Sequence, residues 1–333
     1  MPATSPAIAR PDVGRSASMP LYARYAWGVL AFNLLVILWG GFVRASGSGA
    51  GCGSHWPLCN GEVVPRAPAV ATVIEFGHRV SSGVSLLLIA GLVVGAWRRY
   101  PRRHRVRLGA ALSGAFILGE ALIGAGLVLL EHVATDTSLA RGYWVSGHLV
   151  NTFLLVASLA LTAWWASGGP PPRLRGRGAL AALLGAALAA LLVLGVSGAI
   201  TALGDTLFPV TTLAEGEALT FSDSAHLFVR LRIWHPTLAV GVGVWLGVAV
   251  FSALRARPTP AVRRLVGGLA ALYAAQLGLG ILNVWLLAPL AIQMVHLLLS
   301  DLIWIAFVLL AATVLAAAPR PVGAAPLRRP LPR

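Results

Sequence analysis

The sequence contains little charge, few acidic residues and almost no cysteine. Charged residues make up 11% of the 333 residues, against about 25% in an average soluble domain. All 26 basic residues are arginines, and only 11 residues are acidic. Two cysteines are too few for a disulfide framework, an iron–sulfur cluster or a cysteine-based zinc site. The scarcity of charge argues against an ordinary soluble protein, which cannot hide so much apolar surface.

Apolar residues dominate the rest of the composition. They make up 57% of the chain, the mean hydropathy is +0.80, and a membrane span needs about 20 such residues in a row. Residues 1–24 have no apolar core of their own, so we expect a flexible tail there rather than a cleaved signal peptide. The sequence predicts an all-α integral membrane protein with eight transmembrane helices, near 25–43, 73–97, 108–130, 143–165, 179–203, 230–254, 265–287 and 290–316.

The arginines are distributed unevenly between the two sides of the predicted membrane. A net charge of +15 suggests nucleic acid, but the arginines form short clusters between apolar runs, so we expect no nucleic-acid partner. With the N-terminus in the cytoplasm, 20 of the 26 arginines lie on the inner side and most acidic residues on the outer side. The positive-inside rule therefore predicts a multi-pass protein of the cell (plasma) membrane with both termini cytoplasmic.

The two halves of the sequence resemble each other. Four pairs of positions correspond in the same order: residues 40–47 with 197–204, His78 with His235, residues 120–128 with 276–284, and His148 with His296. An even number of spans in each half gives both halves the same orientation, so the repeat is parallel. We expect two tandem, pseudo-symmetric four-helix bundles at 25–167 and 179–318, a cytoplasmic linker at 168–178, and cytoplasmic tails at 1–24 and 319–333.

Four histidines lie inside, or at the edge of, the even-numbered apolar helices: His78, His148, His235 and His296. Each is four to seven residues from the outer end of its predicted helix, at a depth of roughly 6–11 Å. A helix–helix hydrogen bond would explain one such histidine. Four at one depth, two per half, favour axial ligation of two hemes toward the outer face. The other four histidines lie in loops, and no role is assigned to them: His55, His104, His132 and His226.

Glu75 lies three residues before His78 on the same helical face, and Arg79 follows Glu75 by four residues. One hypothesis is a Glu75–Arg79 ion pair at the helix entrance. The other is a catalytic carboxylate at a porphyrin edge, acting as general base or charge stabiliser. The second half has Arg232 at the matching place, which suggests that one half reacts and the other serves it. Two more intramembrane carboxylates are expected to make structural polar contacts: Glu120 and Asp301.

Cys52 and Cys59 lie in the first outer loop, which faces an oxidising environment in the predicted topology. Their C-x6-C spacing matches neither the thioredoxin-type C-x-x-C nor the C-x-x-C-H of covalent heme attachment. Two roles remain open for the pair. One is a stabilising disulfide, worth about 2–3 kcal/mol, and the other is a redox-active dithiol near the heme edge.

Taken together, these motifs resemble the heme A synthase family. The similar segments are GGFVRASGSGAGCGSHWPLCNG at 40–61, EFGHR at 75–79 and the His-Leu pairs at 148 and 296. The resemblance covers most of residues 25–316 and implies oxidation of the C8 methyl group of heme O to a formyl group, giving heme A for terminal oxidase assembly. It implies that His78 and His148 bind the substrate heme O, with Glu75 as the catalytic carboxylate and Arg79 as a propionate or ion-pair contact. Heme b is then expected in the second half, on His235 and His296.

The second half departs from the family pattern in two ways. It reads RIWHP, where a basic residue is expected after the histidine, and it has no cysteine pair. The first departure concerns the contacts to the heme propionates and leaves the histidine ligand unaffected.

The implied reaction is a four-electron oxidation. An iron held by two histidines has no open position for O₂, so water is expected to supply the oxygen. The implied partners are heme O, heme O synthase, membrane lipid and an electron acceptor that the sequence does not specify, and an oligomer is compatible with it.

Three other functions compete with heme A synthesis as interpretations of the sequence. A di-heme transmembrane b-type cytochrome, moving electrons between quinol and an outer acceptor, would need the same four histidines but not Glu75 in one half only. The parallel repeat also suggests a transporter, but no broken-helix substrate site is evident. Prenyl transfer to heme is disfavoured, because the sequence has no aspartate-rich motif for magnesium and diphosphate.

Overall fold

The computed structural model describes residues 19–316, and the helices account for most of them. The predicted tails fall largely outside these residues, although α1 begins at Leu21, within the predicted N-terminal tail. The helices are α1 (Leu21–Ala45), α2 (Val70–Arg99), α3 (Arg105–Leu129), α4 (Leu139–Ala166), α5 (Gly178–Leu207), α6 (Leu213–Thr220), α7 (Leu227–Arg230), the 3₁₀ turn η1 (Leu231–Ile233), α8 (Trp234–Ala256), α9 (Pro260–Trp285) and α10 (Leu290–Leu315).

Eight of the described segments are long and apolar enough to cross a membrane. They coincide with the eight predicted spans, with α7, η1 and α8 together forming the sixth. Large apolar side chains point outward along them, for example Leu87, Leu122 and Val244. Outward apolar side chains suit helices that are surrounded by lipid tails, so the chain is a multi-pass membrane protein, as predicted.

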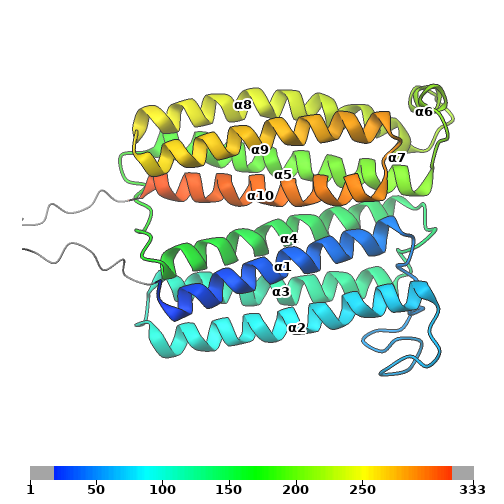
Figure 1. Cartoon of the computed structure of the whole chain (residues 1–333), viewed down its shortest axis with the longest axis horizontal. Coiled ribbons are helices and arrows are strands. Elements are labelled where there is room, and N and C mark those ends of the chain that lie inside the picture. Colours follow the sequence, from blue (N-terminus) through cyan, green and yellow to red (C-terminus); the bar gives the residue numbers. More distant parts are fainter. Residues whose placement is uncertain (1–18, 317–333) are drawn as a thin grey trace, which may run out of the picture.

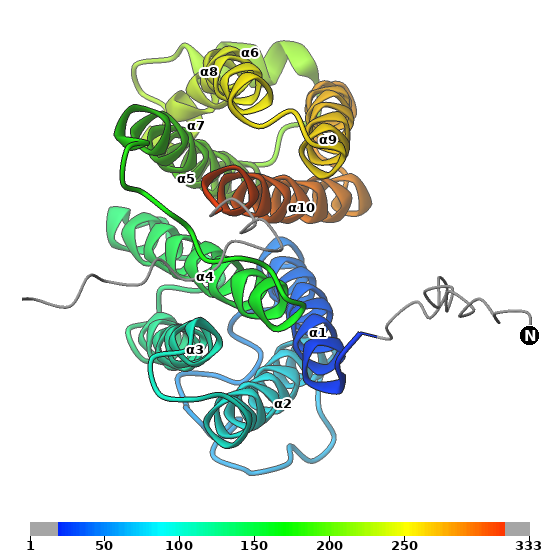
Figure 2. The same cartoon turned by 90° about the vertical axis from the view of Figure 1, so that its left-hand side faces the viewer.

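The spanning helices lie side by side in two groups of four (Figures 1 and 2). One group contains α1 to α4, and the other contains α5, α8, α9 and α10. Between the groups, α4 packs against α5 and α10, and α1 packs against α10. The loop between α1 and α2 and the helix α6 lie at the same end of the molecule (Figure 1). Their common position brings the outer loops of the two halves to one side.

Polar and aromatic contacts join the two groups of helices. The indole N–H of Trp304 donates to the carbonyl of Phe153 at 2.6 Å, and the two rings stack with their centres 5.2 Å apart. Near the loop end, Arg44 of α1 donates to the carbonyl of Ala202 and to the hydroxyl of Thr206, both at 2.8 Å and both on α5. Because Arg44 satisfies backbone and side-chain acceptors of the other group, it fixes α1 against α5.

The sixth span is interrupted just before His235, which the sequence analysis did not predict. The turn η1 covers Leu231–Ile233, and the regular helix α8 resumes at Trp234. Pro236 explains the break, because proline has no N–H to donate to the preceding turn and is best tolerated in the first turn of a helix. The matching stretch of the first half, EFGHR, continues through α2 without a break.

Candidate functional site

The four membrane histidines occupy the second, fourth, sixth and eighth spans, near the loop end of the molecule. His78 is eight residues after the start of α2, His148 nine after the start of α4, and His296 six after the start of α10. His235 is eight residues after the start of α7. The four distances from the helix starts therefore differ by at most three residues. Three of these segments begin three to four residues before the predicted spans, and α10 begins at the predicted residue, so the histidines keep similar distances from the helix starts.

The rings of the second-half pair have the separation that two ligands of one metal ion would have. The ring centres of His235 and His296 are 6.3 Å apart. Two imidazoles on opposite sides of one metal ion place their ring centres roughly 6 Å apart, because each metal–nitrogen bond is about 2 Å long. The described residues contain no group of three or more His, Cys, Asp or Glu side chains suited to a metal ion. A pair of imidazoles fits heme, since the porphyrin supplies the other ligands of its iron.

A glycine lies against one imidazole in each half. A Cβ atom at Gly40 would be 2.9 Å from Cε1 of His78, and a Cβ atom at Gly198 would be 2.9 Å from Cε1 of His235. Neither separation is tolerable, so the absence of a side chain allows each ring to pack directly on the neighbouring helix. Gly40 and Gly198 lie in the two repeat segments at 40–47 and 197–204. In the alignment of these segments Gly40 corresponds to Ser197 and Gly41 to Gly198, so similar support for one histidine in each half comes from neighbouring positions of the repeat.

The Nδ1 atoms of the four histidines have different surroundings. Nδ1 of His235 lies 2.9 Å from the hydroxyl of Ser197. Nδ1 of His148 lies 2.7 Å from Oε2 of Glu120, although this oxygen is off the direction of the N–H bond, so the contact is close but not well aligned. Nδ1 of His78 and of His296 are buried and have no hydrogen-bond partner among the described residues. Among the four histidines of the described residues, Nδ1 of His235 has a hydrogen-bond partner, and Nδ1 of His148 has a close but misaligned carboxylate contact.

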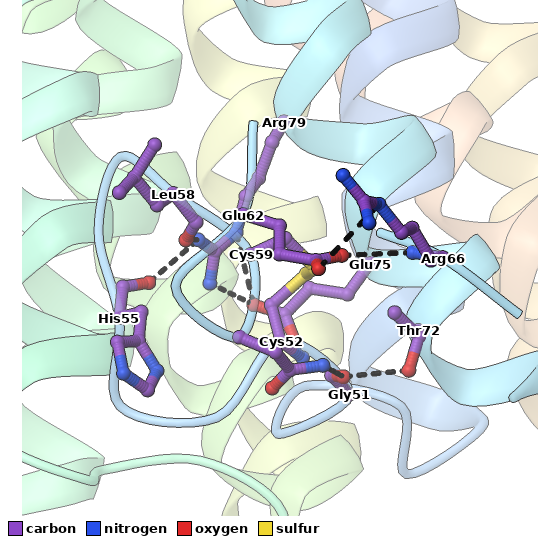
Figure 3. Close-up of a disulfide and its surroundings, with 11 residues drawn as sticks. Gly51, Cys52, His55, Leu58, Cys59, Glu62, Arg66, Thr72, Glu75 and Arg79 are labelled. Carbon is purple, nitrogen blue, oxygen red and sulfur yellow. Dashed lines mark hydrogen bonds and ion pairs between the residues drawn. A yellow bond between two sulfur atoms is a disulfide. The ribbon is translucent and has the colours of Figure 1, made fainter. Parts of the chain in front are cut away.

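Glu75 is buried beneath the first outer loop (Figure 3), with 4% of its surface exposed. The backbone N–H of Cys52 donates to its Oε2 at 2.8 Å, and Nε of Arg79 donates to its Oε1 at 3.1 Å. The predicted ion pair with Arg79 is therefore present. The donor from the loop was not predicted, because nothing in the local sequence shows that the Cys52 backbone returns to α2. Nη2 of Arg79 also donates to Oε1, so only Oε2 keeps a free lone pair with which the carboxylate can accept a proton.

The first outer loop is fastened to the start of α2 at several points (Figure 3). Cys52 and Cys59 form a disulfide. The guanidinium of Arg79 donates to the carbonyls of His55 and Leu58, at 2.6 and 2.7 Å. The loop backbone also approaches α2 so closely that a Cβ atom at Gly51 would be 2.3 Å from the carbonyl oxygen of Ala71. The loop, the disulfide and Glu75 therefore form one connected unit at the start of α2.

The matching place in the second half has the opposite charge. Nε of Arg232 lies 2.8 Å from Oδ1 of Asp205, an ion pair in which the oxygen is off the N–H direction. Arg232 also donates to the carbonyls of Gly204 and Phe208, both at 3.0 Å. These contacts tie η1 to the end of α5. Among the described residues, no carboxylate of the second half occupies the place that Glu75 has in the first.

Several polar residues have roles that differ from the expectation or were not assigned. Glu120 contacts a histidine of the site rather than only neighbouring helices. Both carboxylate oxygens of Asp301 are buried without a hydrogen-bond partner among the described residues, so the expected structural contact is not made. The loop histidines His104 and His226 cap helices, because their Nδ1 atoms accept from backbone N–H groups of α3 and α7. The caps are local, whereas the contact between Glu120 and His148 joins two helices and has no signal in a single sequence.

Known proteins resemble this chain over most of its length. The chain matches the family described as cytochrome oxidase assembly protein, COX15-CtaA, over residues 23–308. A protein of Thermus thermophilus, named protoheme IX farnesyltransferase, is 52% identical over 293 residues, which are 88% of this chain and 48% of that relative.

Shorter matches connect the chain with proteins named heme A synthase. The protein of Halalkalibacterium halodurans is 35% identical over 127 residues, 38% of this chain and 42% of the relative. The protein of an Exiguobacterium species is 40% identical over 113 residues, 34% of this chain and 37% of the relative. The chain spans about half the length of the Thermus relative and less of the other two.

Proposed function

The chain belongs to the COX15-CtaA family of cytochrome oxidase assembly proteins, and we propose that it is a heme A synthase. In this proposal the protein oxidises the C8 methyl group of heme O to a formyl group. His78 and His148 hold the substrate heme O in the first half, and His235 and His296 hold heme b in the second. The names of the two shorter relatives support this choice.

The observation that carries the proposal is the buried carboxylate of Glu75 in only one half. Glu75 is a helical neighbour of His78, at i and i+3, so it lies beside the ring that would bind the substrate iron. Its counterpart Arg232 is positively charged and is engaged with Asp205. A protein that only moved electrons between two equivalent hemes would have no need of this difference. A carboxylate on the helix of His78, and an arginine paired with Asp205 at the matching place before His235, suit one reacting half and one electron-carrying half.

The proposed reaction is balanced with water. The methyl group and one water molecule give the formyl group, four protons and four electrons. Heme b, held by His235 and His296, would supply one-electron transfer toward an outer acceptor. Glu75 accepts a proton at a carboxylate oxygen, and its negative charge stabilises positive charge that develops at the methyl carbon. Arg79 and the Cys52 N–H keep the carboxylate oriented during this step.

We do not propose farnesyl transfer for this chain, although the Thermus thermophilus relative is named a farnesyltransferase. Slightly more than half of that relative lies outside the match. Transfer from a prenyl diphosphate calls for clustered carboxylates that hold magnesium. The five aspartates of this chain are far apart, at Asp12, Asp136, Asp205, Asp223 and Asp301. We assign farnesyl transfer to the unmatched part of the relative, which supports heme O synthase as a physical partner that delivers the substrate.

The proposal also includes the orientation in the membrane. Both termini are placed in the cytoplasm and the four histidines toward the outer face, because most arginines then lie inside. The disulfide loop faces the oxidising side in this orientation, where such a bond persists.

Extraction of heme tests the proposed function. The full chain is produced in cells that also make heme O, then purified, and the extracted hemes are separated by chromatography. We expect heme B together with heme A, and heme O where turnover is incomplete. Production without a heme O source should give no heme A. A protein that carries only heme B under both conditions would favour the di-heme cytochrome instead.

A further inference from the structure

Glu120 of α3 makes the closest polar contact to any of the four histidines. Its Oε2 lies 2.7 Å from Nδ1 of His148 on α4. Its Oε1 accepts from the amide of Asn151 at 2.6 Å and from the hydroxyl of Thr152 at 3.1 Å. The carboxylate is therefore held by two donors on one oxygen, and the other oxygen lies close to Nδ1 of the imidazole without being aligned with its N–H bond. Nε2 of His148 is left for the heme iron.

We propose that Glu120 is a positioning residue of the first-half heme site and makes His148 a stronger iron ligand than its second-half counterpart, His296. The inference rests on the proposed function, since it takes His148 as a heme ligand. A carboxylate that accepts the Nδ1 proton of a ligating histidine fixes its tautomer and ring orientation and raises its basicity. A more basic axial ligand stabilises ferric over ferrous iron, so electrons leave the first-half heme more readily.

The second half lacks this carboxylate at the corresponding place. In the repeat, residues 120–128 align with 276–284, so Gln276 of α9 corresponds to Glu120. A Cβ atom at Gly280, one turn further along α9, would be 3.5 Å from Cε1 of His296, so this face of the helix is directed at the ring. Oε1 of Gln276 and Nδ1 of His296 are both buried and have no hydrogen-bond partner among the described residues. The second-half ligand therefore has only a neutral amide nearby.

A purely structural role for Glu120 makes a different prediction. Asn151 and Thr152 could use the carboxylate only to join α3 and α4, and Gln would serve almost equally well. The difference between the two roles lies in the properties of the bound heme. A structural link does not change a midpoint potential or an electron paramagnetic resonance signal, whereas a carboxylate on the ligand's Nδ1 changes both.

The test is a redox titration of the purified protein with heme in both halves. The variants are Glu120→Gln, Gln276→Glu and, as a matched control, Ser113→Ala. Ser113 also joins α3 to α4, through a 2.9 Å contact with Ser158, but it touches none of the four histidines. We expect Glu120→Gln to shift one of the two midpoint potentials upward and to change one low-spin ferric signal. Heme affinity in the first half should fall roughly 10-fold or more, as for other partners of metal-bound histidines.

The reciprocal variant keeps the inference testable if Glu120→Gln does not retain heme. Gln276→Glu should shift the other midpoint potential downward, and Ser113→Ala should leave both unchanged. Unaltered potentials and signals in both Glu120→Gln and Gln276→Glu would overturn the positioning role. Formation of heme A by the wild-type protein is measured separately, so failure of the proposed function is recognised independently of these potentials.

Discussion

The two halves share their histidine pairs and differ in the groups around them. Both have a glycine that admits one ring, at Gly40 and Gly198. The first half surrounds its pair with two carboxylates, Glu75 and Glu120, and the second half has Arg232 and Gln276 at those places. The repeated part is suited to binding a heme. The differing part changes charge and proton acceptance, which are the properties that distinguish a reacting heme from an electron carrier.

The outer loops differ in the same sense. The first-half loop is closed by the Cys52–Cys59 disulfide and donates a backbone N–H to Glu75. The second-half loop contains the short helix α6, whose cap is made by Thr212 with Glu215. Among the described residues, α6 buries no side chain. Among the described residues, the first loop therefore contacts a carboxylate of the candidate site, and α6 makes no comparable contact.

The largest expected difference between the halves concerns Glu75. The change Glu75→Gln removes the negative charge but keeps the shape, so heme content should stay near normal. The rate of heme A formation should fall by roughly 100-fold or more, which is the usual effect of a positioned acid–base group. The measurement is the rate of heme A formation by purified protein. Glu62→Gln, in the same loop but exposed, is the control. Equal rates in the two variants would leave Glu75 with only its ion pair.

The disulfide comes next in size. Replacing Cys52 and Cys59 together by serine should lower stability by about 2–3 kcal/mol and should slow heme A formation, because the Cys52 N–H no longer holds Glu75 firmly. Thermal unfolding in detergent and the heme A assay measure these two effects. In the native protein neither thiol should react with an alkylating reagent before reduction. Rapid labelling of both cysteines without a reductant would refute the disulfide.

A change at Asp205 tests whether the second-half ion pair is structural. Asp205→Asn leaves Arg232 with two carbonyl acceptors but no counter-ion, so unfolding should become easier by about 1–3 kcal/mol. Heme A formation per bound heme should stay close to that of the wild type. Thermal unfolding and the heme A assay are compared directly with those of Glu75→Gln. If Asp205→Asn and Glu75→Gln both lost only stability, or both lost only activity, the proposed functional difference between the halves would be contradicted.

The smallest effect is a pH dependence in the loop before α4. Partial burial acts to raise the pKa of Asp136, but the N–H of Ser138 and the side chains of His132 and Ser138 outweigh it and lower the pKa. The resulting stabilisation is present above the ordinary pKa near 4 and is lost as the pH falls below it. Asp136→Asn should remove this dependence at a cost of less than about 1 kcal/mol, because solvent screens the loop. The measurement is the unfolding midpoint of the wild type and of Asp136→Asn from pH 3 to pH 6. An equal fall of the two midpoints toward low pH would contradict a role of Asp136.

The sequence predicted the features that follow from local composition. Long apolar runs specify membrane spans on their own, because a lipid environment requires an apolar helix of fixed length. The i and i+4 spacing likewise predicted the Glu75–Arg79 pair. Pro236 gave a local signal for the break before α8, and the sequence analysis missed it.

Contacts between distant segments were not predictable from the sequence. The Cys52 N–H reaches Glu75 only because the loop folds back on α2, and Glu120 meets His148 only because α3 packs on α4 in one rotation. Asp301 shows the converse, since an intramembrane carboxylate was expected to find a partner and has none among the described residues. The rotation of a helix about its axis and the folding of a loop back onto a helix depend on packing over the whole bundle, which no single segment encodes.

The division between a reacting half and an electron-carrying half is tested most directly by the hemes that half-specific variants retain. Cells supplied with heme O would produce the double variants His78→Ala with His148→Ala, and His235→Ala with His296→Ala. The first-half variant should retain heme B and its low-spin b-type spectrum but contain neither heme O nor heme A. The second-half variant should lose heme B, keep heme O and make no heme A. Heme O or heme A in the first-half variant, or loss of the b-type spectrum from that variant alone, would contradict the division.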